Sequence, residues 1–413
     1  MDARGVGGDA SSVRHIHGPP HDHRRARARP NPRRNAMHDT DGSGAATRAA
    51  DHKSDDGRQT SSRRSVLKAA VVASAAPLVS AFLPASVAAG GSPSTHPSPG
   101  AARMPLEPAT QKFVDGLAGA PPTWSLSPAA AHKGLTDLQS KPVAMRPADV
   151  EDTTWPVGPT GTTRIRIVRP KGAKETLPLL MYFHGGGWVL GDKITHDRLV
   201  RELAEGVHAA VVFVDYVNSP EAKYPTQNEQ AYASMVYAVE HAKELNVDAS
   251  RLAIMGDSVG GNMSAAVTLM AKERRGPKIA YQVLIYPLVD YIGDNASYRK
   301  YADGPWITTK TMKWMFDLQG LDGSEGITAF PLRATVEQLR GLPDALVVTD
   351  DDILQDEGEA YAAKLGQAGA RVTCVRYNGT IHDFAMLNPL ADTPAARGAI
   401  AQSIAALKAA LRA

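Results

Sequence analysis

Residues 252–262 read Leu-Ala-Ile-Met-Gly-Asp-Ser-Val-Gly-Gly-Asn. The first four are apolar, which is typical of a strand buried on both faces, and a helical pattern begins near Asn262. Between them, Gly256-Asp257-Ser258-Val259-Gly260 has the form G-x-S-x-G. A serine on such a sharp strand–turn–helix elbow projects its hydroxyl, and the flanking glycines let the backbone pass closely. The pattern alone arises by chance, so its strand and helix context carries the prediction.

Short apolar runs recur along the chain, and helical patterns lie between most of them. The runs occupy 163–168, 179–183, 210–214, 252–255, 283–285, 345–348 and 372–375, and the helical patterns 196–206, 228–245, 262–273, 357–368 and 393–411. This alternation predicts an α/β fold, in which a mostly parallel central sheet is covered by helices on both faces. We expect residues 109–145 and 291–340 to form a helical cap above that sheet.

A second motif, His184-Gly185-Gly186-Gly187-Trp188, directly follows the run 179–183. Consecutive glycines allow backbone N–H groups to point into a cavity, although such a stretch alone could also be a flexible loop. An H-G-G-G motif after an early strand supplies the oxyanion hole of lipases and esterases, which the N–H after the nucleophilic serine completes. We therefore expect the donors to be the N–H groups of Gly186, Gly187 and Val259.

The two motifs together resemble those of the hormone-sensitive-lipase-like group of α/β-hydrolases, marked by H-G-G-G-W and G-D-S-x-G-G-N. The resemblance covers roughly residues 110–411. It extends to Asp215-Tyr216, Ser219-Pro220-Glu221 and Tyr224-Pro225, and departs at Gln230, where the family often has Asp. It implies an α/β-hydrolase fold and a serine esterase or lipase that needs neither metal nor organic cofactor. Trp188 is a candidate substrate contact.

In this fold, the nucleophilic serine is followed along the chain by an acid and then a histidine. Asp350, Asp351 and Asp352 follow the run 345–348, and spacing alone leaves all three open as the acid. The family pattern D-x-L-x-D-E-G selects Asp352. His382 follows the run 372–375 and is the expected general base; Asp383 stands after it, where the family commonly has Gly. The other histidines of residues 90–413 lie in a linker, in the glycine motif or on helical patterns: His96, His132, His184, His196, His208 and His241.

The N-terminal part of the chain is typical of an export leader. Residues 1–61 are basic and polar and are expected to be disordered. Ser62-Arg63-Arg64-Ser65-Val66-Leu67-Lys68 and the uncharged residues 69–89 resemble a twin-arginine signal, with cleavage near Val87-Ala88-Ala89. An uncleaved membrane anchor is the alternative. Residues 90–108 are expected to be a linker, and residues 109–411 the hydrolase domain.

Charge and cysteine content limit the partners. The chain has 46 Lys and Arg against 43 Asp and Glu, but residues 1–89 hold 14 basic and 8 acidic residues, so the surplus belongs to the leader. The charge therefore does not indicate a nucleic acid partner. The single cysteine, Cys374, excludes an intrachain disulfide and a cysteine-based metal cluster.

The sequence thus predicts an exported serine carboxylic-ester hydrolase that acts on short- to medium-chain acyl esters of small molecules. The alternatives are a deacetylase of a secondary metabolite or sugar ester, which would use the same triad, and a non-catalytic ligand-binding module of this fold. The mature chain is expected in a secreted or extracytoplasmic location, without a stable membrane anchor, as a monomer or homodimer.

Overall fold

A computed structural model describes residues 104–412 of the chain. The expected disordered leader at 1–61, the signal at 62–89 and the linker up to residue 103 lie outside the described residues. Helix α1 (Pro108–Asp115) starts at the last residue of the expected linker, with Pro108 at its first position. Among residues 104–412, no helix is both long and apolar enough to cross a membrane.

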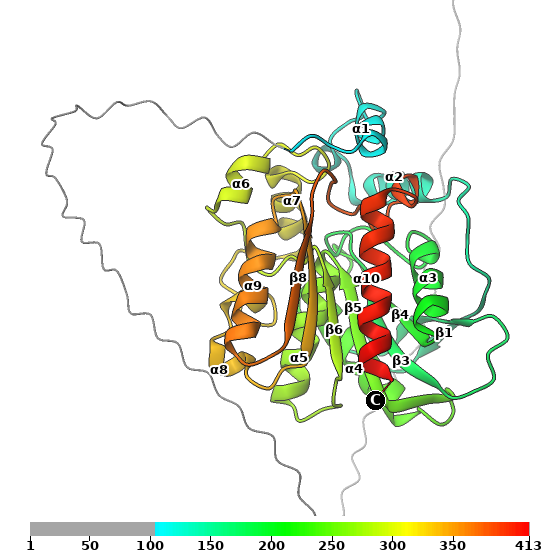
Figure 1. Ribbon diagram of the computed structural model, residues 1–413. Helices are drawn as coiled ribbons and strands as arrows, with labels where there is room; N and C mark the ends of the chain where they lie inside the picture. The colour runs from blue at the N-terminus through cyan, green and yellow to red at the C-terminus, as the bar shows by residue number, and fades with distance from the viewer. Residues whose placement is uncertain (1–103, 413) are drawn as a thin grey trace, which may run out of the picture. The chain divides into compact units, whose positions relative to one another are not determined.

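The core of the domain is one eight-stranded sheet with the strand order β1-β2-β4-β3-β5-β6-β7-β8 (Figure 1). Strands β1 and β2 pair antiparallel, as do β2 and β4, and the pairs from β4 to β8 are parallel. The strands are β1 (Ala148–Trp155), β2 (Thr163–Pro170), β3 (Leu177–Phe183), β4 (Ala210–Asp215), β5 (Val247–Asp257), β6 (Tyr281–Ile285), β7 (Asp344–Asp350) and β8 (Val372–Tyr377).

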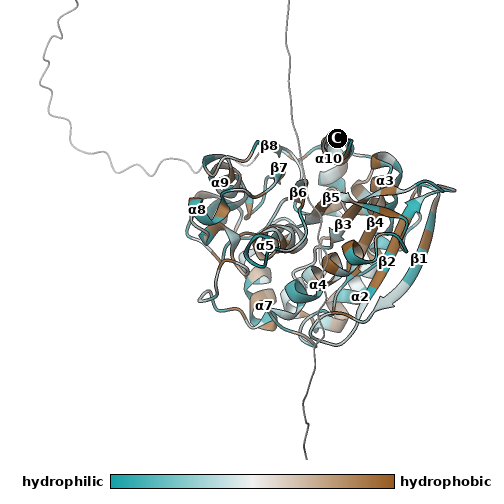
Figure 2. Ribbon diagram, turned by 90° about the horizontal axis from the view of Figure 1, so that it is seen from below, coloured by the Kyte–Doolittle hydropathy of each residue, from teal (hydrophilic) through white to brown (hydrophobic). Residues whose placement is uncertain are grey.

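Helices cover both faces of this sheet. Helices α3 (Asp197–Val207) and α10 (Pro394–Leu411) pack on one face, and α4 (Thr226–Glu240) and α5 (Val259–Glu273) pack on the other (Figure 2). Helix α9 (Gln355–Gln367) packs on β7 and β8. Every residue of β3 and β4 is buried, as a strand covered on both faces requires. The mostly parallel sheet with helices on both faces, which the alternating pattern predicts, is confirmed.

Strand β1 is absent from the sequence-based prediction. It reads Ala-Asp-Val-Glu-Asp-Thr-Thr-Trp, and only its last residue is buried. It lies at the sheet edge, where one side has no neighbouring strand, so its side chains can stay polar. A strand of this kind has no apolar run that periodicity could detect.

The two segments expected to form a cap pack against different parts of the domain. Helices α1 and α2 (Pro128–Gln139) lie across the upper end of the sheet in Figure 1. Of the segment 291–340, α7 (Thr309–Gln319) packs against the 3-10 turn at Thr123–Ser125, whereas α6 (Ala296–Tyr301) and α8 (Val336–Leu339) pack on α9. The Nζ of Lys272 in α5 also donates to the carbonyl of Gln338 in α8 at 2.9 Å. The last part of the segment therefore belongs to the helical layer beside the sheet.

Candidate active site

Ser258 lies on the turn between β5 and α5. Its backbone has φ 54° and ψ −121°, a strained conformation for a residue with a side chain. The Ser258 N–H donates to the carbonyl of Ile285 at 2.8 Å, which anchors the turn to β6. A Cβ added at Gly260 would collide with the carbonyl of Phe183, so glycine is required there for the helix to pass β3. The elbow predicted from G-x-S-x-G is present.

His382 and Asp352 come to Ser258 from loops after β8 and β7. The Nε2 of His382 lies 2.9 Å from the Ser258 Oγ, and its Nδ1 lies 2.5 Å from the Asp352 Oδ2. The other carboxylate oxygen of Asp352 accepts the N–H of Leu354 at 2.8 Å. All three side chains are buried. The structure thus brings together Ser258, His382 and Asp352, the three residues predicted from the sequence.

The two neighbouring acids do not bond to His382. The Oδ2 of Asp351 accepts the N–H of Gly379 at 2.8 Å, which supports the start of the loop that holds His382. Asp350 is fully buried, and none of the described residues donates a hydrogen bond to either of its carboxyl oxygens. Burial and the adjacent Asp352 carboxylate raise the pKa of Asp350 well above its ordinary value. The surroundings of Asp350 therefore favour the neutral form of its carboxyl group.

The electrostatics of His382 suit a general base. Burial lowers the pKa of its imidazole, but the carboxylates of Asp383 and Asp352 raise it, and the net result is a pKa above the ordinary value. A base with this environment accepts a proton readily and holds it while a bond breaks. The arrangement can transfer a proton from the Ser258 hydroxyl to His382.

The glycine loop after β3 lies beside Ser258. Gly186 and Gly187 line the same cavity as Ser258 and His382, and both have positive φ, 102° and 64°. A Cβ added at Gly187 would collide with the side chain of Met315 in α7. Val259 is the first residue of α5, and N–H groups in the first turn of a helix have no partner within the helix. Three backbone donors can therefore face an oxyanion at this position.

A buried carboxylate ties the glycine loop to the elbow. The Oδ1 of Asp257 accepts the Tyr182 hydroxyl at 2.7 Å and the Gly185 N–H at 3.1 Å, and its Oδ2 lies 3.3 Å from the Nε2 of His196. Burial by itself lowers the pKa of His196, yet the Asp257 carboxylate raises it above the ordinary value. The sequence predicts no role for Asp257, and its place next to Ser258 is the one signal that could indicate this contact.

A cavity of about 490 Å³ opens onto Ser258. Its walls are mostly apolar and come from α2, α7, the loops beside these helices and the loops after β3 and β8. The larger apolar side chains are those of Leu117, Leu126, Leu135, Leu138, Leu190, Trp306, Ile307, Met315 and Met386. The exposed residues Asp137 and Lys141 mark its solvent-facing end. A cavity of this size and lining suits a small ester with an apolar part.

The structure corrects one expected substrate contact. Trp188 is 1% exposed, its ring packs 6.3 Å from that of Phe316, and it is not among the residues lining the cavity. Trp306, from the cap, lines the cavity instead.

His184 is also buried, and its ring stacks on Tyr216 at 4.0 Å. Burial, followed by the nearby His196, lowers the pKa of His184 to about 3, so it stays neutral and supports the loop.

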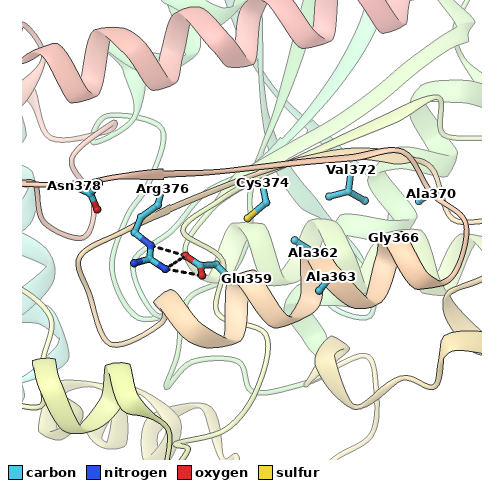
Figure 3. A pocket seen from close by; sticks show the side chains of 9 residues that line it. All are labelled: Glu359, Ala362, Ala363, Gly366, Ala370, Val372, Cys374, Arg376 and Asn378. Carbon is cyan, nitrogen blue, oxygen red and sulfur yellow. Dashed lines mark hydrogen bonds and ion pairs between the residues drawn. The ribbon is translucent and has the colours of Figure 1, made fainter. Parts of the chain in front are cut away.

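Cys374 lies in a different hollow, along the outer strand β8 and helix α9 (Figure 3). The guanidinium of Arg376 pairs there with the Glu359 carboxylate at 2.7 Å. Partial burial and the Glu359 carboxylate raise the pKa of the Cys374 thiol. A raised pKa disfavours the thiolate, which is the nucleophilic form of a cysteine.

Residues from four separate loops thus bring a serine, a histidine, a carboxylate and a glycine loop together at one end of an α/β sheet. This combination defines a serine hydrolase. Residues 180–386 match the alpha/beta hydrolase fold family, and the chain belongs to that family.

Relatives and solved structures agree with this assignment. A carboxylesterase of Mycobacterium tuberculosis, NlhH, is 34% identical over 326 residues, covering 76% of this chain and 99% of its own. An alpha/beta hydrolase of Acanthamoeba polyphaga mimivirus is 37% identical over 296 residues, covering 71% and 84%. The crystal structure of a thermostable esterase from Pseudomonas putida has 46% identity and a TM-score of 0.73, covering 77% of this chain and all of its own. The protein is a serine carboxylic-ester hydrolase.

Proposed function

We propose that this protein hydrolyses short- to medium-chain acyl esters of small alcohols through an acyl-enzyme on Ser258. The observation that carries the proposal is the continuous chain of contacts from Asp352 through His382 to the Ser258 Oγ, at the base of an apolar cavity. A cavity of about 490 Å³ must hold both halves of the substrate, which favours short and medium acyl chains over long ones.

The proposed reaction has two halves. His382 takes the proton of Ser258 as the Oγ attacks the ester carbonyl, and the Asp352 carboxylate stabilises the imidazolium that forms. The N–H groups of Gly186, Gly187 and Val259 stabilise the tetrahedral oxyanion. The imidazolium then protonates the leaving alcohol. Water enters in its place and attacks the acyl carbonyl while it gives a proton to His382, and the imidazolium returns that proton to the Ser258 Oγ as the acid leaves.

The test compares p-nitrophenyl acetate, butyrate and laurate with the wild type and with Ser258→Ala. We expect turnover of acetate and butyrate well above that of laurate, and loss of turnover in the variant. Activity that survives in Ser258→Ala would exclude the mechanism. A profile that peaks at laurate would exclude the proposed chain length, and no turnover by a folded wild type would favour a ligand-binding module.

We propose further that the enzyme is exported. The support is the sequence Ser62-Arg63-Arg64-Ser65-Val66-Leu67-Lys68 followed by an uncharged stretch to residue 89. Fractionation of cells that express the full chain tests it. We expect a shortened enzyme outside the cytoplasm, and retention of full-length protein inside when Arg63 and Arg64 are both changed to Lys. Full-length wild type in the cytoplasm would contradict the proposal.

A further inference from the structure

Asp383 places a second carboxylate beside the catalytic histidine, outside the triad. Its Oδ1 lies 3.5 Å from the Nε2 of His382, the nitrogen that also contacts Ser258. Its Oδ2 accepts the indole N–H of Trp306 at 2.8 Å. The backbone of Asp383 has φ 68°, a conformation that Asp, Asn and Gly adopt more readily than other residues. The carboxylate is therefore held in place from the cap side.

One oxygen of this carboxylate is left without a donor. The Oδ1 of Asp383 is buried and has no hydrogen-bond partner among residues 104–412, although Asp383 lines the cavity above Ser258. Buried polar atoms nearly always have partners, and one that lacks a partner in the free protein points to a ligand group. A carboxylate oxygen accepts hydrogen bonds, so the matching group is a donor.

The position of Oδ1 identifies the half of the substrate that it faces. The alcohol oxygen of the ester must come within about 3 Å of the His382 Nε2 to receive its proton. Asp383 Oδ1 lies 3.5 Å from the same nitrogen. The carboxylate therefore borders the place of the leaving alcohol. A hydroxyl on the carbon next to the ester-bearing carbon can reach it, whereas the surrounding walls are mostly apolar.

We propose that Asp383 is a specificity-determining residue that accepts a hydrogen bond from a free hydroxyl next to the scissile oxygen. The substrates that it selects are monoesters of vicinal diols, a class that includes partly acylated sugars. Trp306 acts as a positioning residue, because its N–H fixes the Asp383 carboxylate. This inference rests on the proposed ester hydrolysis at Ser258.

The expected selectivity follows from the cost of leaving the acceptor unpaired. A site built to bond a substrate hydroxyl discriminates against the analogue that lacks it, because the buried polar group then stays without a partner. For a hydrogen bond to a buried carboxylate we expect about a 10-fold change in kcat/KM. An alkyl group of the same size would fill the space but supply no donor.

The test uses two butyrate esters of nearly equal size, 2-hydroxyethyl butyrate and propyl butyrate, followed by pH-stat titration. The measured quantity is the ratio of their kcat/KM values in the wild type, in Asp383→Gly and in Asp383→Asn. Gly and Asn both accept the φ of this position. Because the intrinsic reactivity of each ester is the same for all enzymes, comparing the ratios between enzymes isolates recognition. Any effect on the basicity of His382 changes both esters alike.

We expect Asp383→Gly to lower the hydroxyethyl-to-propyl ratio about 10-fold. Asp383→Asn should lower it to a similar extent, because the Asn oxygen must stay toward the Trp306 N–H and its NH2 group then replaces the accepting Oδ1. Trp306→Phe should also lower the ratio, because the carboxylate loses its anchor. Asp317→Asn, which changes an exposed carboxylate of α7 outside the lining of the cavity, should leave the ratio as it is. An unchanged ratio in Asp383→Gly would overturn the inference. Turnover of propyl butyrate in the same experiment would still support the proposed ester hydrolysis at Ser258. Hydrolysis of neither ester by the wild type would instead reject the proposed function.

Discussion

The change Asp352→Asn tests the geometry of the triad most directly. In the wild type, the Asp352 Oδ1 accepts the N–H of Leu354 at 2.8 Å, and its Oδ2 faces the His382 Nδ1 at 2.5 Å. An asparagine must keep its oxygen toward Leu354, because an NH2 group there would place two donors against each other. Its NH2 group then faces the Nδ1 of His382, which must act as an acceptor.

The consequence is the wrong tautomer of His382. With Nδ1 accepting, the proton of the neutral imidazole moves to Nε2, the atom 2.9 Å from the Ser258 Oγ. That nitrogen can no longer take the serine proton. Loss of this function in a serine triad lowers kcat by about 10⁴-fold, which corresponds to about 5 kcal/mol of transition-state free energy.

The assay is kcat for p-nitrophenyl butyrate, with thermal unfolding of each variant to show that it folds. Asp351→Asn is the matched control, because it makes the same chemical change one residue away. The Asp351 oxygen that accepts the Gly379 N–H can remain an oxygen, so we expect activity within a few-fold of the wild type. Activity of Asp352→Asn within 10-fold of the wild type would refute the reasoning, and loss of activity in Asp350→Asn alone would assign the acid to Asp350.

Three further predictions follow from the site. The Asp383 carboxylate raises the pKa of His382, and kcat/KM requires the neutral form of His382. Asp383→Asn should therefore move the acid limb of the pH profile of kcat/KM to lower pH, and a limb that moves to higher pH would contradict this. Tyr182→Phe removes a bond to the buried Asp257 carboxylate and should lower the free energy of unfolding in urea by about 2 kcal/mol, whereas an unchanged midpoint would exclude this anchoring role. Gly187→Ala should lower kcat for p-nitrophenyl butyrate by about 10²-fold or more through displacement of an oxyanion donor, and an effect confined to KM would argue against that donor.

The fold and the order of its parts could be read from the sequence, because these depend on local patterns. The runs 179–183 and 210–214 are apolar throughout and became the fully buried strands β3 and β4. Strand β1 could not be found this way, because it is polar and has no apolar run. Only its pairing with β2 identifies it as a strand. The export signal remains a prediction from residues 62–89.

The site was predictable only in part. Periodicity and spacing left three acids open, and a family pattern was needed to choose Asp352. The structure explains the choice: the Oδ2 of Asp352 meets His382, whereas Asp351 supports the loop at Gly379. Trp188 follows the glycine loop, but its side chain packs inward, away from the cavity.

What the sequence by itself determined is the strand–serine–helix elbow, the glycine loop and the alternating α/β order. These features depend on residues close together in the chain, where backbone geometry leaves few choices. Only the tertiary structure decided which acid bonds to His382, that Trp306 and Met315 wall the cavity, and that Asp383 has an unpartnered oxygen beside the catalytic nitrogen. Those outcomes depend on the directions of side chains from segments far apart in sequence, and these directions are set by how the helices and loops pack against one another.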